Sequence, residues 1–311
     1  MVTNILVTGS NGLLGKSLQK IVSQYQEGYK FFFLTRSDCD LTDIHSIKNM
    51  FKTIQPDIVI HLASVVGGVY ENMNNNYRLF LDNIRINTNI IDACNLFKVK
   101  KLINILSTCI FPDLNIKYPL TADQIHNGPP HFSNMGYAYS KRILHIGASL
   151  LPNTQVINII PTNLYGENDN YNIDKAHVIP ALIHKTYLAQ LNNTPLYISG
   201  SGNALRQFLY IDDLSNIIYN LVKTQDNLKQ RDIIICPPES HEISIKDLVN
   251  KIVNIFDFNG KIVYDTTKND GQLKKTSKSD ELLHDYNFTN INTGLINTIS
   301  YFIKHYNTLR T

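Results

Sequence analysis

The first half of the chain alternates short hydrophobic runs with longer amphipathic segments. The amphipathic segments lie at roughly 13–25, 44–54, 80–97 and 136–150, and their spacing indicates helices. The hydrophobic runs have the length of buried strands and lie at 5–7, 31–34, 58–60, 102–106 and 156–160. This alternation predicts an α/β fold with a Rossmann-type, doubly wound parallel sheet whose strands are joined by crossover helices.

The alternation weakens after about residue 165, where polar loops and prolines interrupt shorter elements. The apolar run 233–235 is expected to return to the main sheet, and helical spacing reappears at 248–256 and 295–306. The asparagine-rich stretch 72–76 is polar and is expected to form a loop. These differences predict two domains: a Rossmann domain at 1–165 plus roughly 204–240, and a smaller, mixed C-terminal substrate domain at 166–203 and 241–311.

The composition restricts the class of protein more than its function. The 311 residues are 43% hydrophobic and carry a formal charge of +3, which is typical of a folded, globular chain. The densest basic run, at 274–278, is too short to indicate nucleic-acid binding, and no apolar run approaches the length of a membrane span. Four cysteines lack the paired spacing of metal or disulfide frameworks. We therefore expect a cytoplasmic protein with reduced thiols, no metal, and no nucleic-acid or membrane partner.

A glycine-rich turn directly follows the first predicted strand. Gly9, Gly12 and Gly15 form the pattern Gly-x-x-Gly-x-x-Gly immediately before a predicted helix. Gly9 permits a tight turn, Gly12 lets backbone amides approach a pyrophosphate, and Gly15 lets the helix pack closely on the sheet. Three glycines alone are weak evidence, but their position between a strand and a helix favours dinucleotide binding over a simple turn.

The ends of the other predicted strands supply further candidate cofactor contacts. Arg36 follows the second strand, where NAD-preferring sites usually carry a carboxylate, so it is expected to bind a 2′-phosphate and to favour NADPH over NADH. The alternative is an exposed arginine with Asp38 as its neighbour. Because the carboxyl ends of parallel strands share one edge of a sheet, we expect the remaining cofactor contacts there: Ser10, Asn11, Leu13, Leu14, Asp40, Leu41, Ala63, Ser64 and Pro161.

Candidate catalytic residues lie at the end of the fourth predicted strand and on the following helix. Tyr137 and Lys141 are four residues apart and share one helical face, where the ammonium is expected to lower the pKa of the phenol and make it a proton donor. Ser107 is placed to hold a carbonyl oxygen together with Tyr137. Cys109 is unusual because simple ketone reduction needs no thiol. The pattern predicts nicotinamide-dependent carbonyl chemistry, with a second activity at the thiol.

Longer motifs connect the chain to a known family. They are Ser107–Pro112, Tyr137-x-x-x-Lys141, Pro161–Gly166 and His177–Pro180, with further similar segments at 66–68, 126–131, 183–185 and 265–272. With these motifs the chain resembles the GDP-L-fucose synthase family of extended short-chain dehydrogenase/reductases over nearly its whole length. The resemblance implies NADPH-dependent epimerisation at C-3 and C-5 of GDP-4-keto-6-deoxy-D-mannose, followed by reduction at C-4 to GDP-L-fucose. It also implies a homodimer, with the helices near 80–97 and 136–150 as the expected interface.

The resemblance also assigns roles to individual residues. It implies that Cys109 takes a proton and His177 returns one during epimerisation, while Ser107 and Tyr137 stabilise the enolate through the ketone oxygen. Near the nicotinamide, the implied contacts are Lys141, Asn163, Leu164 and His177. For the GDP-sugar substrate, they are Lys185, Arg206 and Lys275 at the diphosphate, Asp270 at the guanine or sugar, and Ser199. Members of the family commonly carry Trp at the position of Ser199, and this chain contains no Trp, so that substrate contact is lost or replaced.

Other functions fit the motifs less well. A nucleotide-sugar 4,6-dehydratase needs an acidic pair after the active-site Ser or Thr, where this chain has Cys109 and Ile110. A 4-epimerase of the UDP-galactose type normally has a small inert residue in place of Cys109. A cofactor-sensing binding protein tends to lose the catalytic Tyr or Lys, and both are present here. The alternative that stays open is a related epimerase/reductase acting on a different 4-keto-6-deoxy nucleotide sugar.

Overall fold

The computed structural model describes residues 2–25, 28–224, 230–268 and 270–309, and it is organised around a parallel sheet of six strands. The strand order is β10-β5-β4-β3-β1-β2, and each neighbouring pair runs parallel. The predicted doubly wound α/β class is confirmed, and the run 233–235 returns to the sheet beside β5 as expected. The strands are β1 (Thr3–Thr8), β2 (Tyr29–Leu34), β3 (Ile58–His61), β4 (Lys101–Ile105), β5 (Gln155–Pro161) and β10 (Gln230–Ile235).

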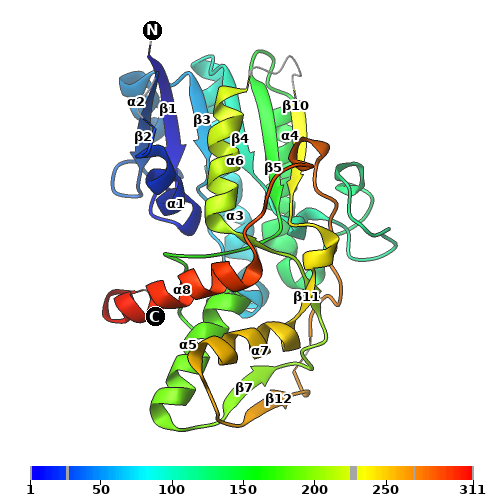
Figure 1. Cartoon of the computed structure of the whole chain (residues 1–311). Helices are drawn as coiled ribbons and strands as arrows, with labels where there is room; N and C mark the ends of the chain where they lie inside the picture. Colours follow the sequence, from blue (N-terminus) through cyan, green and yellow to red (C-terminus); the bar gives the residue numbers. More distant parts are fainter. Residues whose placement is uncertain (1, 26–27, 225–229, 269, 310–311) are drawn as a thin grey trace.

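Helices cover both faces of this sheet (Figure 1). On one face α1 (Leu13–Val22) lies along α6 (Ile211–Lys223), and on the other lie α2 (Ile44–Ile54), α3 (Val69–Leu96) and α4 (Met135–Ser149). Successive strand residues point to opposite faces, so Ile5 and Val7 pack with the α1–α6 layer while Leu6 packs with α2 and α3. Because both faces are covered, the strands read as continuous apolar runs in the sequence.

The start of α3 differs from the sequence prediction. The helix begins at Val69 rather than near residue 80, and it includes the stretch 72–76, so the loop predicted there is wrong. Asn75 has non-helical angles (φ −124°, ψ 26°) and kinks the helix. The Asn76 side-chain oxygen accepts a hydrogen bond of 2.8 Å from the Gly136 amide at the start of α4. Tertiary contacts of this kind support a helix that the local composition disfavours.

A second group of elements lies below the carboxyl edge of the sheet in Figure 1. Its helices are α5 (Val178–Asn192), α7 (Ile245–Phe256) and α8 (Ile291–His305), the last two close to the predicted 248–256 and 295–306. Paired strands accompany them: β7 (Leu196–Ser199) with β12 (Ile262–Asp265), β6 (Asn163–Tyr165) with β9 (Phe208–Tyr210), and β8 (Leu205–Arg206) with β11 (Ile243–Ser244). Leu248, Leu295 and Phe302 belong to a hydrophobic core of this group's own.

Six short 3₁₀ turns complete the described elements. The 3₁₀ turns are η1 (Thr108–Ile110), η2 (Ala122–Gln124), η3 (Phe132–Asn134), η4 (Glu239–His241), η5 (Glu281–Leu283) and η6 (Tyr306–Thr308). In the described ranges, no helix combines the length and the apolar character that a membrane span requires.

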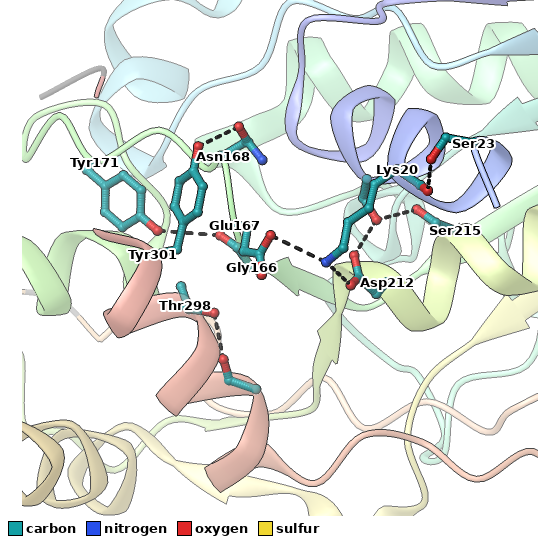
Figure 2. Close-up of polar contacts among 12 residues, drawn as sticks. Lys20, Ser23, Gly166, Glu167, Asn168, Tyr171, Asp212, Ser215, Thr298 and Tyr301 are labelled. Carbon is teal, nitrogen blue, oxygen red and sulfur yellow. Dashed lines mark hydrogen bonds and ion pairs between the residues drawn. The ribbon is translucent and has the colours of Figure 1, made fainter. Parts of the chain in front are cut away.

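Polar contacts join the two groups of elements beside α1 (Figure 2). The Lys20 ammonium of α1 lies 2.8 Å from Asp212 of α6 and 3.4 Å from Glu167, which follows β6. Next to Glu167, Asn168 accepts a hydrogen bond of 2.7 Å from Tyr301 of α8. Exposed ion pairs of this kind contribute about 1 kcal/mol or less. Their main effect is therefore to fix how α6 and the loop after β6 lie against α1.

Candidate active site

A cavity of about 1080 Å³ lies at the carboxyl edge of the sheet. Strand β1 lies between β2 and β3, so the chain continues to one side of β1 and later crosses to its other side. Doubly wound sheets bind ligands at such a switch point. Both groups of elements line the cavity, with Gly9 after β1 and Lys185 on α5. Every residue that the sequence predicts for catalysis, cofactor binding or substrate binding contributes to the lining. The structure thus brings all the predicted site residues together, while the role of each stays a prediction.

The glycine turn forms a backbone-lined end of the cavity. Gly9 has φ +75°, and a Cβ atom there would lie 2.7 Å from the Ala63 nitrogen. A Cβ atom on Gly15 would lie 2.6 Å from the Gly9 oxygen, whereas one on Gly12 would lie 3.3 Å from the same oxygen. Within the described chain, no side chain caps the N-terminus of α1. The backbone N–H groups of its first turn are therefore placed as a pyrophosphate site requires.

Arg36 lies after β2, and its exposed side chain lines the cavity. The neighbouring Asp38 carboxylate accepts hydrogen bonds from the Thr35 amide and hydroxyl at 2.8 and 2.6 Å, so it is directed at Thr35. Hydrogen bonds from Thr42 lower the pKa of Asp40, and the charge of Arg36 adds to this effect. This placement is compatible with the predicted contact between Arg36 and a 2′-phosphate.

Asn83 of α3 fixes the loop after β3, and the sequence reasoning missed it. Its side-chain oxygen accepts hydrogen bonds from the Ser64 hydroxyl at 2.7 Å and from the Val65 amide at 2.8 Å. Its side-chain nitrogen donates to the Val65 carbonyl at 2.9 Å. Because Ser64 lines the cavity, this buried asparagine positions one of the predicted cofactor contacts.

His61 at the end of β3 is a second buried residue that the sequence reasoning missed. Its Nδ1 lies 2.9 Å from the Thr8 hydroxyl, and its Nε2 lies 3.1 Å from the side-chain oxygen of Asn87. The Asn87 side-chain nitrogen donates to the Ser140 carbonyl, so its oxygen accepts from Nε2, which assigns the neutral Nε2–H tautomer. Burial and the charge of Lys141 lower the pKa of His61 to about 3. The sequence signal was a histidine placed directly after the apolar run 58–60.

Tyr137 and Lys141 lie on the first turns of α4, beside the end of β4. The Lys141 ammonium is buried, donates a hydrogen bond of 2.7 Å to the Ile105 carbonyl, and lies 5.8 Å from the centre of the Tyr137 ring. Burial lowers the pKa of Lys141 to about 7. Burial also raises the pKa of Tyr137, and negative charge on Cys109 raises it further. The expected lowering of the phenol pKa is therefore wrong in direction, because burial favours the uncharged phenol and keeps it protonated.

Cys109 lies on η1, immediately after β4, and its electrostatic surroundings differ from those of the other cysteines. Its backbone amide donates to the Ser107 hydroxyl at 3.2 Å, and the Lys275 ammonium lies 3.8 Å from its sulfur. Burial acts to raise the pKa of Cys109, but the charge of Lys275 and hydrogen bonds from Ser107, Asn134 and Lys275 bring the pKa below its ordinary value. By contrast, burial raises the pKa of Cys236 to about 12. Cys109 thus has the character of a reactive thiol.

His177 directly precedes α5 and lines the same cavity. Solvent in the cavity reaches its side chain, yet the surrounding protein desolvates the imidazolium and lowers the pKa of His177. At neutral pH the imidazole is therefore neutral, with one nitrogen carrying a proton and the other accepting. An imidazole and a thiol in one cavity are the two proton carriers that inversion at carbon requires.

The substrate end of the cavity carries cationic side chains. Burial lowers the pKa of Lys185, and the charge of Asp174 opposes this shift. Arg206 of β8 donates a hydrogen bond of 2.7 Å to the Leu205 carbonyl and lines the cavity together with Lys275. Three cations in one cavity are compatible with the predicted diphosphate site.

Asp270 has a task in the structure that the sequence did not indicate. Its carboxylate accepts hydrogen bonds of 2.6 Å from both the amide and the hydroxyl of Ser201. Those hydrogen bonds lower the pKa of Asp270. They hold the glycine turn that follows Ser199, where Gly200 has φ +86°. The contact of Asp270 with guanine or sugar stays a prediction, and the shaping of this turn is what the structure adds.

Comparisons with known proteins identify the family. The model of the NAD dependent epimerase/dehydratase family matches residues 5–236. A GDP-L-fucose synthase from Dictyostelium discoideum is 42% identical over 314 residues, which cover 98% of this chain and 97% of that protein. The chain belongs to the GDP-L-fucose synthase family.

Two further relatives agree with this family. A probable GDP-L-fucose synthase from Drosophila melanogaster is 35% identical, covering 98% of this chain and 99% of that protein. The crystal structure of a GDP-L-fucose synthetase from Naegleria fowleri bound to NADP has a TM-score of 0.90 at 40% identity, covering 99% of this chain and 95% of that chain. The resemblance seen in the motifs is confirmed.

Proposed function

We propose that this chain is a bifunctional, NADPH-dependent enzyme that epimerises C-3 and C-5 of GDP-4-keto-6-deoxy-D-mannose and reduces C-4 to give GDP-L-fucose. The observation that carries this proposal is the lowered pKa of the Cys109 thiol in the same cavity as Ser107, Tyr137 and Lys141. A plain ketone reductase needs the last three residues only. A thiolate beside them supplies the base that epimerisation requires.

The chemistry uses one oxygen for all steps. The hydrogens at C-3 and C-5 flank the C-4 ketone, so the Cys109 thiolate takes one as a proton and the electron pair moves to the ketone oxygen. Ser107 and the protonated Tyr137 donate hydrogen bonds to that enolate oxygen. His177 takes up a proton from solvent in the cavity, delivers it as an imidazolium to the opposite side of the carbon, and so returns to its neutral form. When bound, NADPH supplies the hydride for C-4. Tyr137 then gives its proton to the same oxygen.

The two groups of elements divide the binding work in this proposal. The glycine turn, Arg36 and the loop after β3 bind NADPH on the sheet. Lys185 and Arg206 bind the diphosphate of the GDP-sugar from the second group. Lys185 lies within the predicted limits of the substrate domain, whereas Arg206 lies in the segment 204–240 that was predicted for the Rossmann domain.

We also infer that the enzyme acts as a cytoplasmic homodimer through α3 and α4. Large apolar side chains are exposed on these helices and at the C-terminal end of α4: Tyr77 at 77%, Ile146 at 48% and Leu150 at 73%. Reduced cysteines suit the cytoplasm. Light scattering of the intact chain tests the dimer: the Ile146→Glu, Leu150→Glu variant is expected to be monomeric, and a monomeric parent chain contradicts the inference.

An isotope experiment tests the proposed reaction. The protein is supplied with NADPH and GDP-4-keto-6-deoxy-D-mannose in heavy water, and both cofactor oxidation and deuterium in the product are followed. Deuterium at C-3 and C-5 together with cofactor oxidation is the expected result. Oxidation without deuterium contradicts epimerisation and leaves a plain reductase. Faster turnover of another 4-keto-6-deoxy nucleotide sugar favours the alternative substrate.

A further inference from the structure

The pairing of Lys275 with Cys109 brings together residues that are 166 positions apart in the chain. The Lys275 ammonium lies 3.8 Å from the Cys109 sulfur, and both side chains line the cavity. The resemblance had assigned Lys275 to the diphosphate. We propose instead that Lys275 is the counter-ion that holds Cys109 in its thiolate form, which makes it a positioning residue for proton abstraction.

The backbone after Lys275 is held firmly, which favours a fixed partner over a mobile phosphate ligand. Leu120 donates a backbone hydrogen bond of 2.8 Å to the Thr276 carbonyl. The side chain of Gln207 accepts from the Ser277 amide at 2.8 Å and donates to the Ser277 carbonyl at 3.2 Å. Thr276 and Ser277 are buried, and the Thr276 hydroxyl donates to Glu242. The ammonium is therefore presented to the sulfur from a segment with little freedom to move.

The other groups around the sulfur also favour its negative charge. Ser107 and Asn134 hydrogen-bond with Cys109. Arg206 contributes a second positive charge, which interacts with Cys109 across the cavity. Tyr137, which interacts electrostatically with Cys109, stays a protonated phenol and adds no negative charge. Two carboxylates that interact with Arg206 each hold a hydrogen bond of their own: Glu242 accepts from Thr276, and Asp270 accepts from Ser201.

Proton abstraction needs this charge from the protein. A free thiol has a pKa of about 8.5 and is mostly uncharged at pH 7. The nicotinamide ring of NADPH is uncharged, so it gives no positive charge to the sulfur before the hydride leaves. In the abstraction step a C–H bond breaks, an S–H bond forms, and the electron pair goes to the ketone oxygen. Lys275 then favours loss of the S–H proton to solvent or substrate, which readies the thiolate for the second carbon.

Titration of the thiol without sugar tests the pairing in the NADPH-bound protein. The other cysteines are buried, so alkylation by iodoacetamide, located by mass spectrometry, reports on Cys109. We expect Lys275→Met to move the midpoint of the alkylation rate upward by about one pH unit and to slow alkylation at pH 7 about tenfold. Lys275→Arg is expected to keep the parental midpoint within about half a unit. Lys185→Met is the matched control, a cation of the same cavity whose loss is expected to leave the midpoint unchanged.

Kinetics with the sugar separate the two roles of Lys275. Because this part rests on the proposed function, deuterium incorporation at C-3 and C-5 is measured alongside. As a positioning residue, Lys275→Met lowers kcat for incorporation about tenfold, leaves KM within about threefold, and recovers at high pH. A raised KM with unchanged kcat, or an unmoved thiol midpoint, overturns the pairing. A parent chain that incorporates no deuterium overturns the proposed function and leaves the thiol result standing. Should Lys275→Met fail to fold, Lys275→Gln serves the same comparison.

Discussion

The cofactor end of the cavity is made largely of backbone, whereas the substrate end is made of long charged side chains. At the cofactor end, added Cβ atoms on Gly9 and Gly15 would lie 2.7 and 2.6 Å from backbone atoms. At the substrate end, Lys185, Arg206 and Lys275 reach the cavity from α5, β8 and the segment after Gly271. The difference teaches that the first end selects by shape and the second by charge. Added volume should therefore harm one end, and lost charge the other.

The largest effect is expected where the two ends meet. Tyr137→Phe removes the hydroxyl that serves the ketone oxygen, and kcat for ketone reduction is expected to fall about a hundredfold to ten-thousandfold. Stopped-flow oxidation of NADPH measures it. Cofactor affinity should change little, because the ring stays in place. A Tyr137→Phe variant with the parental kcat would show that the Tyr137 hydroxyl takes no part in the reduction.

A single methyl group tests the backbone-lined end. Gly15→Ala places a Cβ atom 2.6 Å from the Gly9 oxygen, so the turn must open, and NADPH affinity is expected to fall about a hundredfold. Gly12→Ala, at 3.3 Å from the same oxygen, is the matched control with a loss of about tenfold or less. Calorimetric titration with NADPH measures both. Equal losses for the two variants contradict a limit set by shape.

Arg36 is the predicted 2′-phosphate contact at the cofactor end, so it tests whether charge also matters there. Arg36→Leu is expected to weaken NADPH binding about thirtyfold and to leave NADH binding nearly unchanged, because only NADPH carries the 2′-phosphate. Binding constants for both cofactors give the ratio. Equal weakening of NADPH and NADH places Arg36 outside the phosphate site.

The substrate end should respond to charge and to salt. Lys185→Met keeps the length of the side chain and removes its charge, so KM for the GDP-sugar is expected to rise about tenfold. The parental KM should also rise with salt, and more steeply than that of the variant. Steady-state kinetics at several salt concentrations test this. A salt response that is the same in both proteins speaks against a phosphate contact.

The smallest expected effect concerns the stability of the cofactor end. His61 has a pKa of about 3 in the folded chain and an ordinary value near 6.5 when unfolded, so the unfolded state binds more protons between these values. Its contribution to folding is therefore complete above pH 6.5 and decreases as the pH falls. Between pH 8 and pH 6 the free energy of unfolding is expected to fall by about 1 kcal/mol through His61 alone. Urea unfolding of the parent and of His61→Gln measures the difference.

The sheet was accessible to sequence reasoning because its central strands, such as β3 and β4, are buried on both faces. A run such as 102–106 is therefore apolar except for the buried Asn104, and it can be recognised as a strand from the sequence. The start of α3 was not accessible, because its asparagines are supported by contacts such as that between Asn76 and Gly136, which lie 60 positions apart. A contact between residues so far apart cannot be predicted from the local composition of either segment.

The candidate site divides in the same way. Strand ends such as Gly9 and Ser107 were placed correctly at one edge because parallel strands share that edge. The pKa direction of Tyr137 was wrong because it depends on how deeply the phenol is buried. The roles of Asn83 and His61 were missed because nothing in the sequence distinguishes a buried polar residue from an exposed one before its hydrogen-bond partners are known.

The distance along the chain between Cys109 and Lys275 has a consequence for biosynthesis. The first five strands of the sheet leave the ribosome well before the last, and domains generally begin to fold from the N-terminus. The thiol therefore emerges 166 residues before its cationic neighbour. A nascent chain can assemble most of the sheet while the sulfur still behaves as an ordinary cysteine. The thiol becomes reactive only once Lys275 has been made and its segment has packed beside the sheet.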